Sequence, residues 1–505
     1  MSQATTTREL LDHGADDAEA IGAPGRSSLD YAGLRTHVAA TVERINELGV
    51  GRNDAVAIVL PNGPEMASAF VAIGAGATTA PLNPAYTRDE FHFYLSDLEA
   101  RLLVVEAGST SPALDVAAEL GISVATLQAD SDSPAGIFTL DGQAGTASTP
   151  GFAAPDDVGL VLHTSGTTSR PKIVPLSQAN ICASAANVAD SIALLPGDRC
   201  LNIMPLFHIH GLIAAVLSSL HAGASVHCSP GFNALHFFRW LDEVKPTWYT
   251  GVPTMHQAIL GRAARNQETI DNVPLRLIRS SSASLPPQVM AELEETFGAP
   301  VIEAYGMTEA AHQMASNPLP PKPRKPGSVG LPAGPDVAIM SEAGSLLPAG
   351  EIGEIVIRGP NVTAGYKKND QANAEAFTDG WFRTGDQGVA DEEGYFRLTG
   401  RLKEIINRGG EKISPREVDE VLLDHPAVAQ VVTFAVPHPK LGEDVAAAIV
   451  LGEGAEADEK SIRAFASERL TDMKVPRTIL FLDEIPKGAT GKLQRIGLAE
   501  KLGLA

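Results

Sequence analysis

The first half of the chain repeats one pattern, in which an apolar run ends in turn residues or passes into a helical stretch. The run at 55–60 is followed by a turn at 61–63, and residues 65–76 then have the character of a helix. Further apolar runs of this kind lie at 101–106, 158–163, 225–228 and 247–251. Strands that alternate with helices form largely parallel sheets with helices on both faces. The sequence therefore predicts an α/β fold with a large N-terminal domain of mostly parallel sheets.

The pattern changes in the last third of the chain. Short alternating segments separated by Gly, Pro and Asp predict a small antiparallel barrel or distorted sheet, at 354–358 and 394–398. Beyond Gly400, helices and strands of a compact α+β unit are predicted at 415–424, 428–436, 444–450 and 459–470. We place the domain boundary at 401–403, which gives an N-terminal domain of residues 1–400 and a C-terminal domain of residues 401–505.

Composition narrows the class of protein. The 505 residues carry a formal charge of −22, which argues against binding to nucleic acid or to an anionic membrane. No apolar window of about eighteen residues occurs, and residues 1–14 lack the basic start and apolar run of a secretory signal. The cysteines have neither metal-ligand spacing nor an even number, as expected for thiols in a reducing compartment: Cys182, Cys200 and Cys228. We therefore expect a cytoplasmic protein.

The segment 163–172 reads HTSGTTSRPK and follows an apolar run. Backbone amides and hydroxyls in such a loop can donate to the oxygens of a triphosphate, and Lys172 adds a positive charge. The spacing of its glycine and lysine differs from that of a Walker loop. The residues expected to contact phosphate are Thr164, Ser165, Gly166, Thr167 and Thr168. The segment therefore predicts a nucleotide site of another type.

This loop resembles the signature loop of the adenylate-forming superfamily, which contains acyl-CoA synthetases, luciferases and adenylation domains of peptide synthetases. Segments similar to other motifs of that family follow in the same order along the chain: PLFH at 205–208, YGMTE at 305–309, GWFRTGD at 380–386, GRLK at 400–403, RGGEKISP at 408–415 and PKGATGK at 486–492. The resemblance covers essentially the whole chain. It implies an enzyme that activates a carboxylic acid with ATP and Mg²⁺ and transfers the acyl group to coenzyme A.

The resemblance also implies catalytic roles. Glu309 is similar to the residue that holds Mg²⁺, and the Thr308 hydroxyl would contact the α-phosphate. Lys492 resembles the lysine that bridges the acid and the phosphate in the adenylating transition state, where two anions must meet. The residues assigned to catalysis are Lys492, Thr308, Glu309, Lys172 and His208.

Nucleotide binding is assigned in the same way. Tyr305 would stack on adenine against a wall of Ser282, Ala283 and Ser284. Asp386 resembles the acid that accepts both ribose hydroxyls, with support from Arg401. Beside the phosphate loop, the assigned residues are Ser282, Ala283, Ser284, Glu303, Ala304, Tyr305, Thr308, Asp386 and Arg401.

Members of this superfamily rotate a small mobile C-terminal domain between two half-reactions. The resemblance places Gly409 and Gly410 along the tunnel for the pantetheine arm of CoA, because glycine allows close approach of the backbone. Lys403 occupies the hinge position. The sequence does not fix the resting orientation of this domain, the oligomeric state or the kinetic constants.

Several departures from the common motifs resemble the oxalyl-CoA synthetase branch of the superfamily. They include His163 before the signature threonine, Ser169 and Ile173 in place of glycines, and the wall sequence SAS at 282–284. The acid pocket of that branch would need polar donors for a second carboxylate. The residues expected to line it are His208, Ser281, Ser282 and His312.

Two other functions stay open on the sequence alone. One is a CoA ligase for medium-chain or long-chain fatty acids, which would need an extended apolar channel. The other is an adenylation protein that loads a carrier domain or binds nucleotide without turnover. We expect oxalate to be the preferred acid, on the strength of the branch resemblance.

Overall fold

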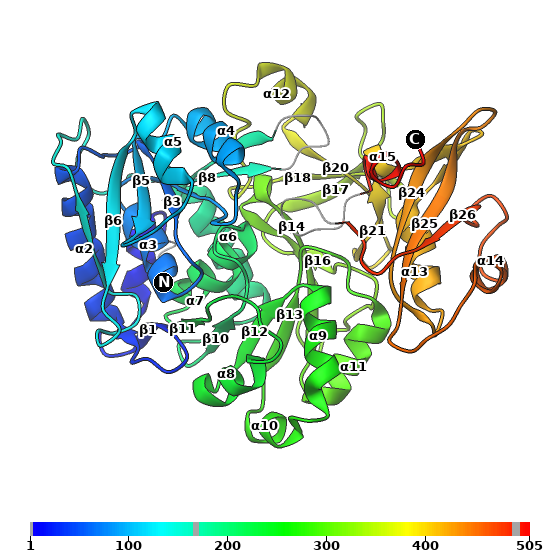
Figure 1. The fold of residues 1–505 in the computed structure, drawn as a ribbon, viewed down its shortest axis with the longest axis horizontal. Helices are drawn as coiled ribbons and strands as arrows, with labels where there is room; N and C mark the ends of the chain where they lie inside the picture. The colour runs from blue at the N-terminus through cyan, green and yellow to red at the C-terminus, as the bar shows by residue number, and fades with distance from the viewer. Residues whose placement is uncertain (1–3, 165–170, 487–494) are drawn as a thin grey trace. The chain divides into compact units, whose positions relative to one another are not determined.

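The computed structural model describes residues 4–164, 171–486 and 495–505 (Figure 1). The chain divides into two compact units. In the described residues, the first consists of 4–164, 171–337 and 357–382, and the second of 338–356, 383–486 and 495–505. The predicted domain boundary at 401 remains a prediction.

A seven-stranded sheet occupies one half of the first unit. Its five central strands are parallel, and β7 and β9 pair antiparallel at the two edges. The strand order is β7 (Phe138–Gly142), β6 (Ser123–Ala129), β5 (Leu102–Glu106), β3 (Ala55–Val59), β4 (Thr78–Pro81), β8 (Val158–Thr164) and β9 (Lys172–Ser177). The strands expected at 55–60, 101–106 and 158–163 are therefore confirmed as members of one largely parallel sheet.

A nine-stranded sheet forms the other half of this unit. It is parallel from β14 to β1, and β15 and β2 are the first antiparallel strands on either side. The order is β16 (Leu331–Pro332), β15 (His312–Ser316), β14 (Val301–Met307), β13 (Leu277–Ser280), β12 (Trp248–Gly251), β10 (Arg199–Asn202), β11 (Ser225–Cys228), β1 (Glu19–Gly22) and β2 (Leu29–Asp30). Every residue of β13 is buried, so a polar side chain on this strand needs an internal partner.

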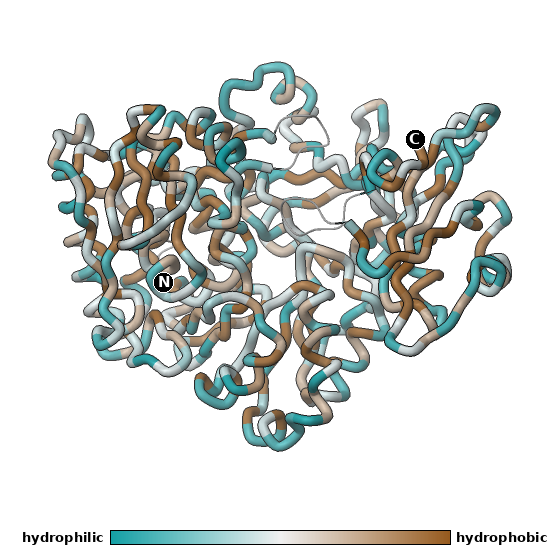
Figure 2. The backbone as a smooth tube through the Cα atoms, in the orientation of Figure 1, coloured by the Kyte–Doolittle hydropathy of each residue, from teal (hydrophilic) through white to brown (hydrophobic). Residues whose placement is uncertain are grey.

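Helices cover these sheets, whose strands are mostly apolar in Figure 2. Local signals set their starts: Pro64 begins α3, and reciprocal capping boxes at Thr87 and Ser177 begin α4 and α6. The helices of the first unit are α1 (Thr7–Leu10), α2 (Tyr31–Glu47), α3 (Pro64–Gly74), α4 (Arg88–Leu98), α5 (Ala113–Leu120), α6 (Gln178–Ser191), α7 (Ser218–His221), α8 (Phe237–Val244), α9 (Pro253–Ala263), α10 (Gln267–Asn272), α11 (Pro287–Phe297) and α12 (Asp370–Ala376). None of the helices in the described part of the chain is both long and apolar enough to cross a membrane.

A five-stranded sheet follows, as the alternating segments at 354–358 and 394–398 predict. It contains β17 (Asp336–Met340), β18 (Gly353–Arg358), β19 (Phe377–Thr378), β20 (Trp381–Ala390) and β21 (Phe396–Arg401). The strand expected at 394–398 begins two residues later. The reason is a tight turn in which the amide of Gly394, at φ +83°, donates to the carbonyl of Asp391.

The C-terminal part of the second unit is an α+β fold. Its sheet has the order β23 (Glu411–Ile413), β22 (Ile406–Arg408), β25 (Gly442–Leu451) and β24 (Val428–His438), with β26 (Thr478–Phe481) also paired to β25. The helices are α13 (Pro415–Leu423), α14 (Glu459–Ser467) and α15 (Leu498–Lys501). The helix expected at 459–470 ends at Ser467, because the amide of Arg469 bonds only three residues back to Ala466 in a tightened last turn.

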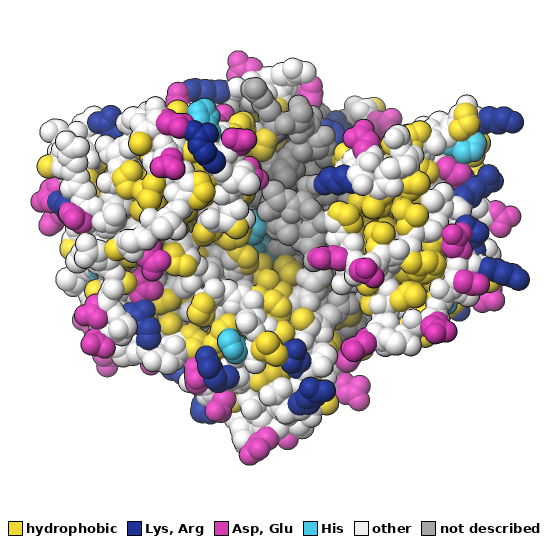
Figure 3. Space-filling view, viewed as in Figure 1, with side chains coloured by type: hydrophobic (Ala, Val, Ile, Leu, Met, Phe, Trp, Pro, Cys, Tyr) yellow, Lys and Arg dark blue, Asp and Glu magenta, His cyan; other side chains and the backbone are white. Residues whose placement is uncertain are grey.

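Acidic and basic side chains are interspersed over the face of the molecule shown in Figure 3. On this face the negative charge is not gathered into one patch. The formal charge of −22 is therefore no sign of a dedicated acidic surface there.

Candidate active site

The hydroxyl-rich loop predicted to contact the triphosphate is framed by two antiparallel strands. Thr164 ends β8 and Lys172 begins β9, and these two residues face each other across the ladder. Next to them, His163 Nε2 lies 3.0 Å from a carboxylate oxygen of Asp97, which anchors the end of β8. Five predicted residues lie outside the described part of the chain, and their roles stay predictions: Ser165, Gly166, Thr167, Thr168 and Lys492.

Lys172 and Glu309 are linked through a tyrosine that the sequence reasoning missed. The hydroxyl of Tyr366 donates to Glu309 Oε1 at 3.0 Å, and Lys172 Nζ lies 4.4 Å from the centre of the Tyr366 ring. Burial raises the pKa of Tyr366, so its hydroxyl stays protonated and can donate. The structure therefore brings the predicted phosphate-binding lysine over the ring of one tyrosine and the predicted metal-binding carboxylate to its hydroxyl.

Glu309 fits the role of a magnesium ligand. It lies in the short turn Thr308–Ala310 after β14 and is 6% exposed. Among the described residues, no three His, Cys, Asp or Glu side chains gather into a metal site made by protein alone. Mg²⁺ is commonly held by one or two carboxylates together with the phosphates of its substrate. Glu309 would supply the carboxylate for Mg²⁺ that arrives with ATP.

Of the two predicted walls of the adenine site, one lies on β14 and the other in the loop that follows its neighbour, β13. Ser280 and Glu303 face each other across β13 and β14, and the Ser281 hydroxyl donates to the carbonyl oxygen of Ala304 at 2.9 Å. Glu303 Oε1 accepts the backbone N–H of Leu285 at 2.9 Å, which ties the loop after β13 to β14. The predicted residues Ser282, Ala283, Ser284, Glu303, Ala304 and Tyr305 are therefore brought together.

Asp386 and Arg401 form a pair within the second unit. They face each other across β20 and β21, and Arg401 Nε donates to Asp386 Oδ1 at 3.1 Å. Asp386 is 5% exposed, whereas the side chain of Arg401 is more than half exposed. A buried carboxylate oriented by an arginine can accept the two hydroxyls of a ribose.

Gly409 and Gly410 lie in the turn between β22 and β23. Their φ angles are +62° and +98°, in the left-handed region that favours glycine. Lys403 lies in the turn Leu402–Glu404, within the predicted hinge. The roles of these three residues in CoA binding and domain rotation stay predictions.

A buried polar cluster lies where three of the predicted acid-binding residues meet. The Arg279 guanidinium donates from Nη2 to His312 Nε2 at 2.9 Å and lies 3.3 Å from His210 Nε2 through Nη1. The rings of His210 and His312 stack with centroids 5.0 Å apart. His210 Nδ1 lies 3.0 Å from the hydroxyl of Ser282, and the neighbouring Ser281 is fully buried.

Ser282 holds an unusual backbone conformation that serves this cluster. Its φ of +72° lies in the left-handed region, which is costly for a residue with a Cβ. Non-glycine residues kept in this region concentrate at functional sites. Here the side chain that glycine would lack supplies the hydroxyl that meets His210.

Arg279 is a buried cation whose contacts differ from those of an ordinary buried arginine. Its relative exposure is 0%, and among the described residues its side chain contacts two imidazoles and an amide but forms no ion pair with a carboxylate. Burial lowers the pKa of Arg279 to about 9, which leaves the guanidinium charged at neutral pH. Buried charges are ordinarily paired, because an isolated ion loses its hydration without compensation. The cluster therefore has the character of a binding site for an anion.

The sequence reasoning missed two residues of this cluster, although the amino-acid sequence carries a signal for each. Arg279 interrupts the apolar run of a central parallel strand, where an apolar residue is expected. His210 follows the chosen His208 by two residues and opens a π-helical segment, His210–Leu217, a feature common at functional sites. The ring of His208 lies against Phe207, with centroids 4.8 Å apart.

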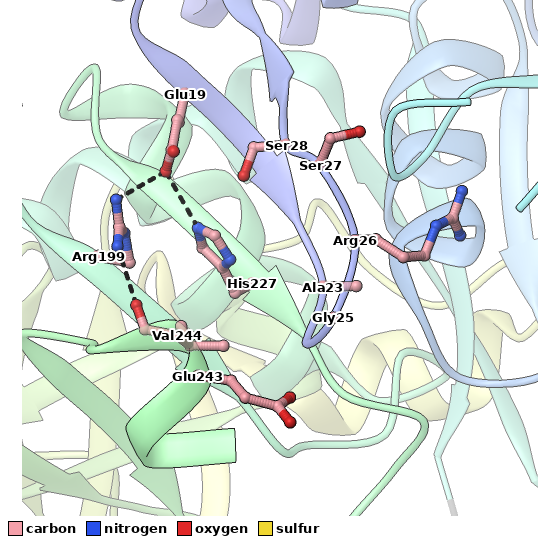
Figure 4. A pocket seen from close by; sticks show the side chains of 10 residues that line it. All are labelled: Glu19, Ala23, Gly25, Arg26, Ser27, Ser28, Arg199, His227, Glu243 and Val244. Atoms are coloured by element: carbon pink, nitrogen blue, oxygen red, sulfur yellow. Dashed lines mark hydrogen bonds and ion pairs between the residues drawn. The ribbon is translucent and has the colours of Figure 1, made fainter. Parts of the chain in front are cut away.

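A separate surface pocket of about 420 Å³ lies at β1, β10 and β11 in the same unit (Figure 4). Glu19 is paired there with Arg199 at 2.8 Å and lies 3.4 Å from His227 Nε2. Arg199 also donates to the carbonyl of Val244. In this pocket Glu19 and Arg199 thus compensate each other's charge.

Comparison with known proteins identifies the family. The model of the AMP-binding enzyme family matches residues 11–367, which is more than half of the chain. The chain belongs to the AMP-binding enzyme family. A model of the AMP-binding enzyme C-terminal domain also matches, at residues 417–492.

Among relatives of this AMP-binding enzyme, the oxalate–CoA ligase of Arabidopsis thaliana is 47% identical, over 95% of this chain and 94% of that protein. The oxalate–CoA ligase of Saccharomyces cerevisiae is 43% identical, over 89% of this chain and 87% of its own length. A crystal structure of ATP-bound MatB from Rhodopseudomonas palustris has a TM-score of 0.88 at 30% identity, and covers 98% of both chains. The superfamily and the oxalate–CoA ligase branch inferred from the motifs are confirmed.

Replacing Glu309 by glutamine in this AMP-binding enzyme should weaken its dependence on Mg²⁺, because the amide keeps the shape but loses the negative charge. We expect the Mg²⁺ concentration for half-maximal pyrophosphate release to rise more than about 10-fold. Tyr366→Phe is the matched variant, since it keeps the ring beside Lys172 and removes only the hydroxyl that orients Glu309. The Mg²⁺ concentration for half-maximal pyrophosphate release should rise less in Tyr366→Phe than in Glu309→Gln. An unchanged Mg²⁺ requirement in Glu309→Gln would exclude the metal-binding role.

Replacing Asp386 by alanine should mainly weaken nucleotide binding. Loss of hydrogen bonds from two ribose hydroxyls to a carboxylate, at about 1.5–3 kcal/mol each, gives a drop in ATP affinity of about 10²-fold or more. Calorimetric titration with ATP measures this drop in affinity. Arg401→Ala is the comparison, because it removes the partner of Asp386 and keeps the acceptor. An ATP affinity equal to that of the unaltered enzyme in Asp386→Ala would refute the ribose role.

Proposed function

We propose that this enzyme uses ATP to join oxalate to coenzyme A. It is an AMP-forming acid–CoA ligase: a carboxylate oxygen of the acid attacks the α-phosphorus of ATP, and pyrophosphate leaves. The CoA thiol then attacks the carbonyl carbon of the acyl adenylate, and AMP leaves with the electron pair of the broken C–O bond. The acid and the nucleotide are both anions, so the site has to supply positive charge and hydrogen-bond donors.

The uncompensated charge of Arg279 is the observation that best supports oxalate as the acid substrate. Oxalate keeps a second carboxylate one bond away from the reacting one. That group would neutralise Arg279 and accept hydrogen bonds from its neighbours in the cluster. A fatty acid would instead place methylene groups beside a buried cation, which costs several kcal/mol in lost hydration. The polar cluster therefore favours a short dicarboxylate over an alkyl chain.

The relatives support the same acid. The plant and yeast relatives are oxalate–CoA ligases and are aligned with this chain over nearly its whole length. Both are named as ligases of CoA, which favours CoA over a carrier domain as the acyl acceptor.

The remaining roles follow from the residues and the family. Mg²⁺ bound at Glu309 would neutralise charge on the phosphates of ATP. Lys172 and the loop that begins at Thr164 bind those phosphates, and Thr308 binds the α-phosphate. Tyr305 stacks on adenine. Lys492 serves the adenylation step, and a C-terminal domain that starts at residue 401 turns about Lys403 to bring Gly409 and Gly410 to the CoA arm. A cytoplasmic location stays a prediction.

The test of this function is a panel of acids assayed for pyrophosphate release in the presence and absence of CoA. Oxalate should give the highest kcat/KM, ahead of malonate, acetate and octanoate, and oxalyl-CoA should accumulate only when CoA is present. Oxalate should also raise the melting temperature of the enzyme in ATP and Mg²⁺, because a ligand of the native state stabilises it by mass action. A preference for octanoate would reject oxalate and leave the adenylating chemistry intact.

A further inference from the structure

Gln313 holds Arg279 in place without neutralising it. Its side chain is fully buried on β15, and its Oε1 accepts a hydrogen bond from Arg279 Nη2 at 3.0 Å. Arg279 also contacts the two imidazoles of His210 and His312. An amide and two imidazoles therefore surround the guanidinium, at a depth where a carboxylate would be the usual partner.

The orientation of the Gln313 amide is fixed from its far side. The hydroxyl of Ser191, at the end of α6, donates to the carbonyl of Val188 at 2.9 Å and so offers its oxygen as an acceptor. Gln313 Nε2 donates to that oxygen at 3.1 Å. With Nε2 turned toward Ser191, Oε1 must face Arg279.

The backbone of Gln313 is held as firmly as its side chain. Its N–H donates to the hydroxyl of Ser184 at 3.1 Å, and its carbonyl accepts from Asn361 Nδ2 at 2.7 Å. It also faces Gly306 across β14 and β15, where a Cβ on Gly306 would lie only 1.6 Å from the carbonyl oxygen of His312. The glycine of the YGMTE motif thus lets β15 fold back and bring His312 and Gln313 to Arg279.

We propose that Gln313 is a specificity-determining residue, which positions Arg279 as an uncompensated cation so that the second carboxylate of a dianionic acid becomes its counter-ion. This proposal rests on the proposed ligase function and adds to it the residue that sets the charge of the acid pocket. A neutral amide orients the guanidinium through one hydrogen bond. A glutamate in the same place would orient it equally well but would also neutralise it, and the acid would then have to displace a buried ion pair.

The decisive variant is Gln313→Glu, which has the same size and shape and adds a negative charge. We expect its KM for oxalate to rise at least about 10²-fold, with kcat changed less than about 10-fold and the KM for ATP unchanged. In the absence of ligands, its melting temperature should equal or exceed that of the unaltered enzyme, because the buried cation gains a partner. If Gln313 had only a structural role, Gln313→Glu would instead lower the melting temperature.

Gln313→Met is the matched control, because it removes the hydrogen bond to Arg279 and adds no charge. Its KM for oxalate should rise much less than in Gln313→Glu. Equal losses in the two variants, or an unchanged oxalate KM in Gln313→Glu, would overturn the proposal. The melting temperature is measured without substrate, so it tests the role of Gln313 independently of the reaction. The acid panel on the unaltered enzyme tests the ligase function separately. If the panel favours malonate, Gln313→Glu should raise the KM for malonate instead. If the panel favours a monoacid, the proposed role of Gln313 is rejected.

Discussion

Replacing Arg279 by methionine is expected to lower kcat/KM for oxalate by at least about 10²-fold while leaving ATP affinity unchanged. At this position on β13, methionine keeps a long, unbranched side chain but removes the positive charge. The second carboxylate of oxalate would then be buried without its partner, and removal of one member of a buried ion pair typically costs 3–5 kcal/mol. Pyrophosphate release at varied oxalate, with calorimetric titration of ATP, measures both quantities.

Stability provides a control for this variant. Arg279 is buried and has no carboxylate partner in the described structure, so removing its charge should offset the loss of its hydrogen bonds to His312 and Gln313, and the melting temperature of the free enzyme should change little. A folded Arg279→Met variant with undiminished oxalate turnover would contradict the anion site. Loss of turnover with every acid in the panel would show that the residue serves the fold or the nucleotide rather than the second carboxylate.

Arg279→Lys adds a dependence on pH whose sign is fixed. Burial disfavours the charged form of a lysine and lowers its pKa, from an ordinary value already below that of arginine. The ammonium is charged below the lowered pKa and neutral above it. Oxalate turnover by Arg279→Lys should therefore fall as pH rises, across a range in which the unaltered enzyme retains its charge and its activity.

Much of the fold could be predicted from local patterns. Apolar runs followed by helices identified β3, β5, β8, β11 and β12, because a parallel strand buried on both faces has a distinctive composition. The phosphate loop was placed after β8 for the same reason, whereas β9, the strand that follows the loop, was not predicted. Its flanking residues Thr164 and Lys172 do face each other, since an antiparallel pair follows from two adjacent strands joined by a loop.

The chemistry of the acid pocket could be predicted only in part, because it depends on contacts between distant segments. Arg279 meets His312 through the fold-back of β15, 33 residues further along the chain. Tyr366 reaches Glu309 across 57 residues. No local period encodes such pairs. The only signals in the sequence were an arginine in an apolar strand and a second histidine close to the first.

Lys492→Ala is expected to suppress formation of the acyl adenylate by about 10²-fold or more and to leave thioester formation from pre-made adenylate nearly unchanged. The lysine resembles the family residue that lies between the attacking carboxylate and the α-phosphate, where one positive charge offsets two approaching anions. Removal of one such contact in a transition state typically costs on the order of 10²-fold. The thioester step has no such pair of anions, because the CoA thiol attacks a carbonyl carbon.

Two half-reaction assays distinguish this role from a general loss of folding or of ATP binding. Isotope exchange between pyrophosphate and ATP in the presence of oxalate reports adenylation, and release of AMP from oxalyl adenylate on addition of CoA reports thioester formation. Lys487→Ala is the matched control, since it removes a lysine from the same PKGATGK segment, five residues earlier. It should retain both half-reactions. Equal losses in both half-reactions for Lys492→Ala would refute the assignment, because a residue used only in adenylation leaves the second step intact.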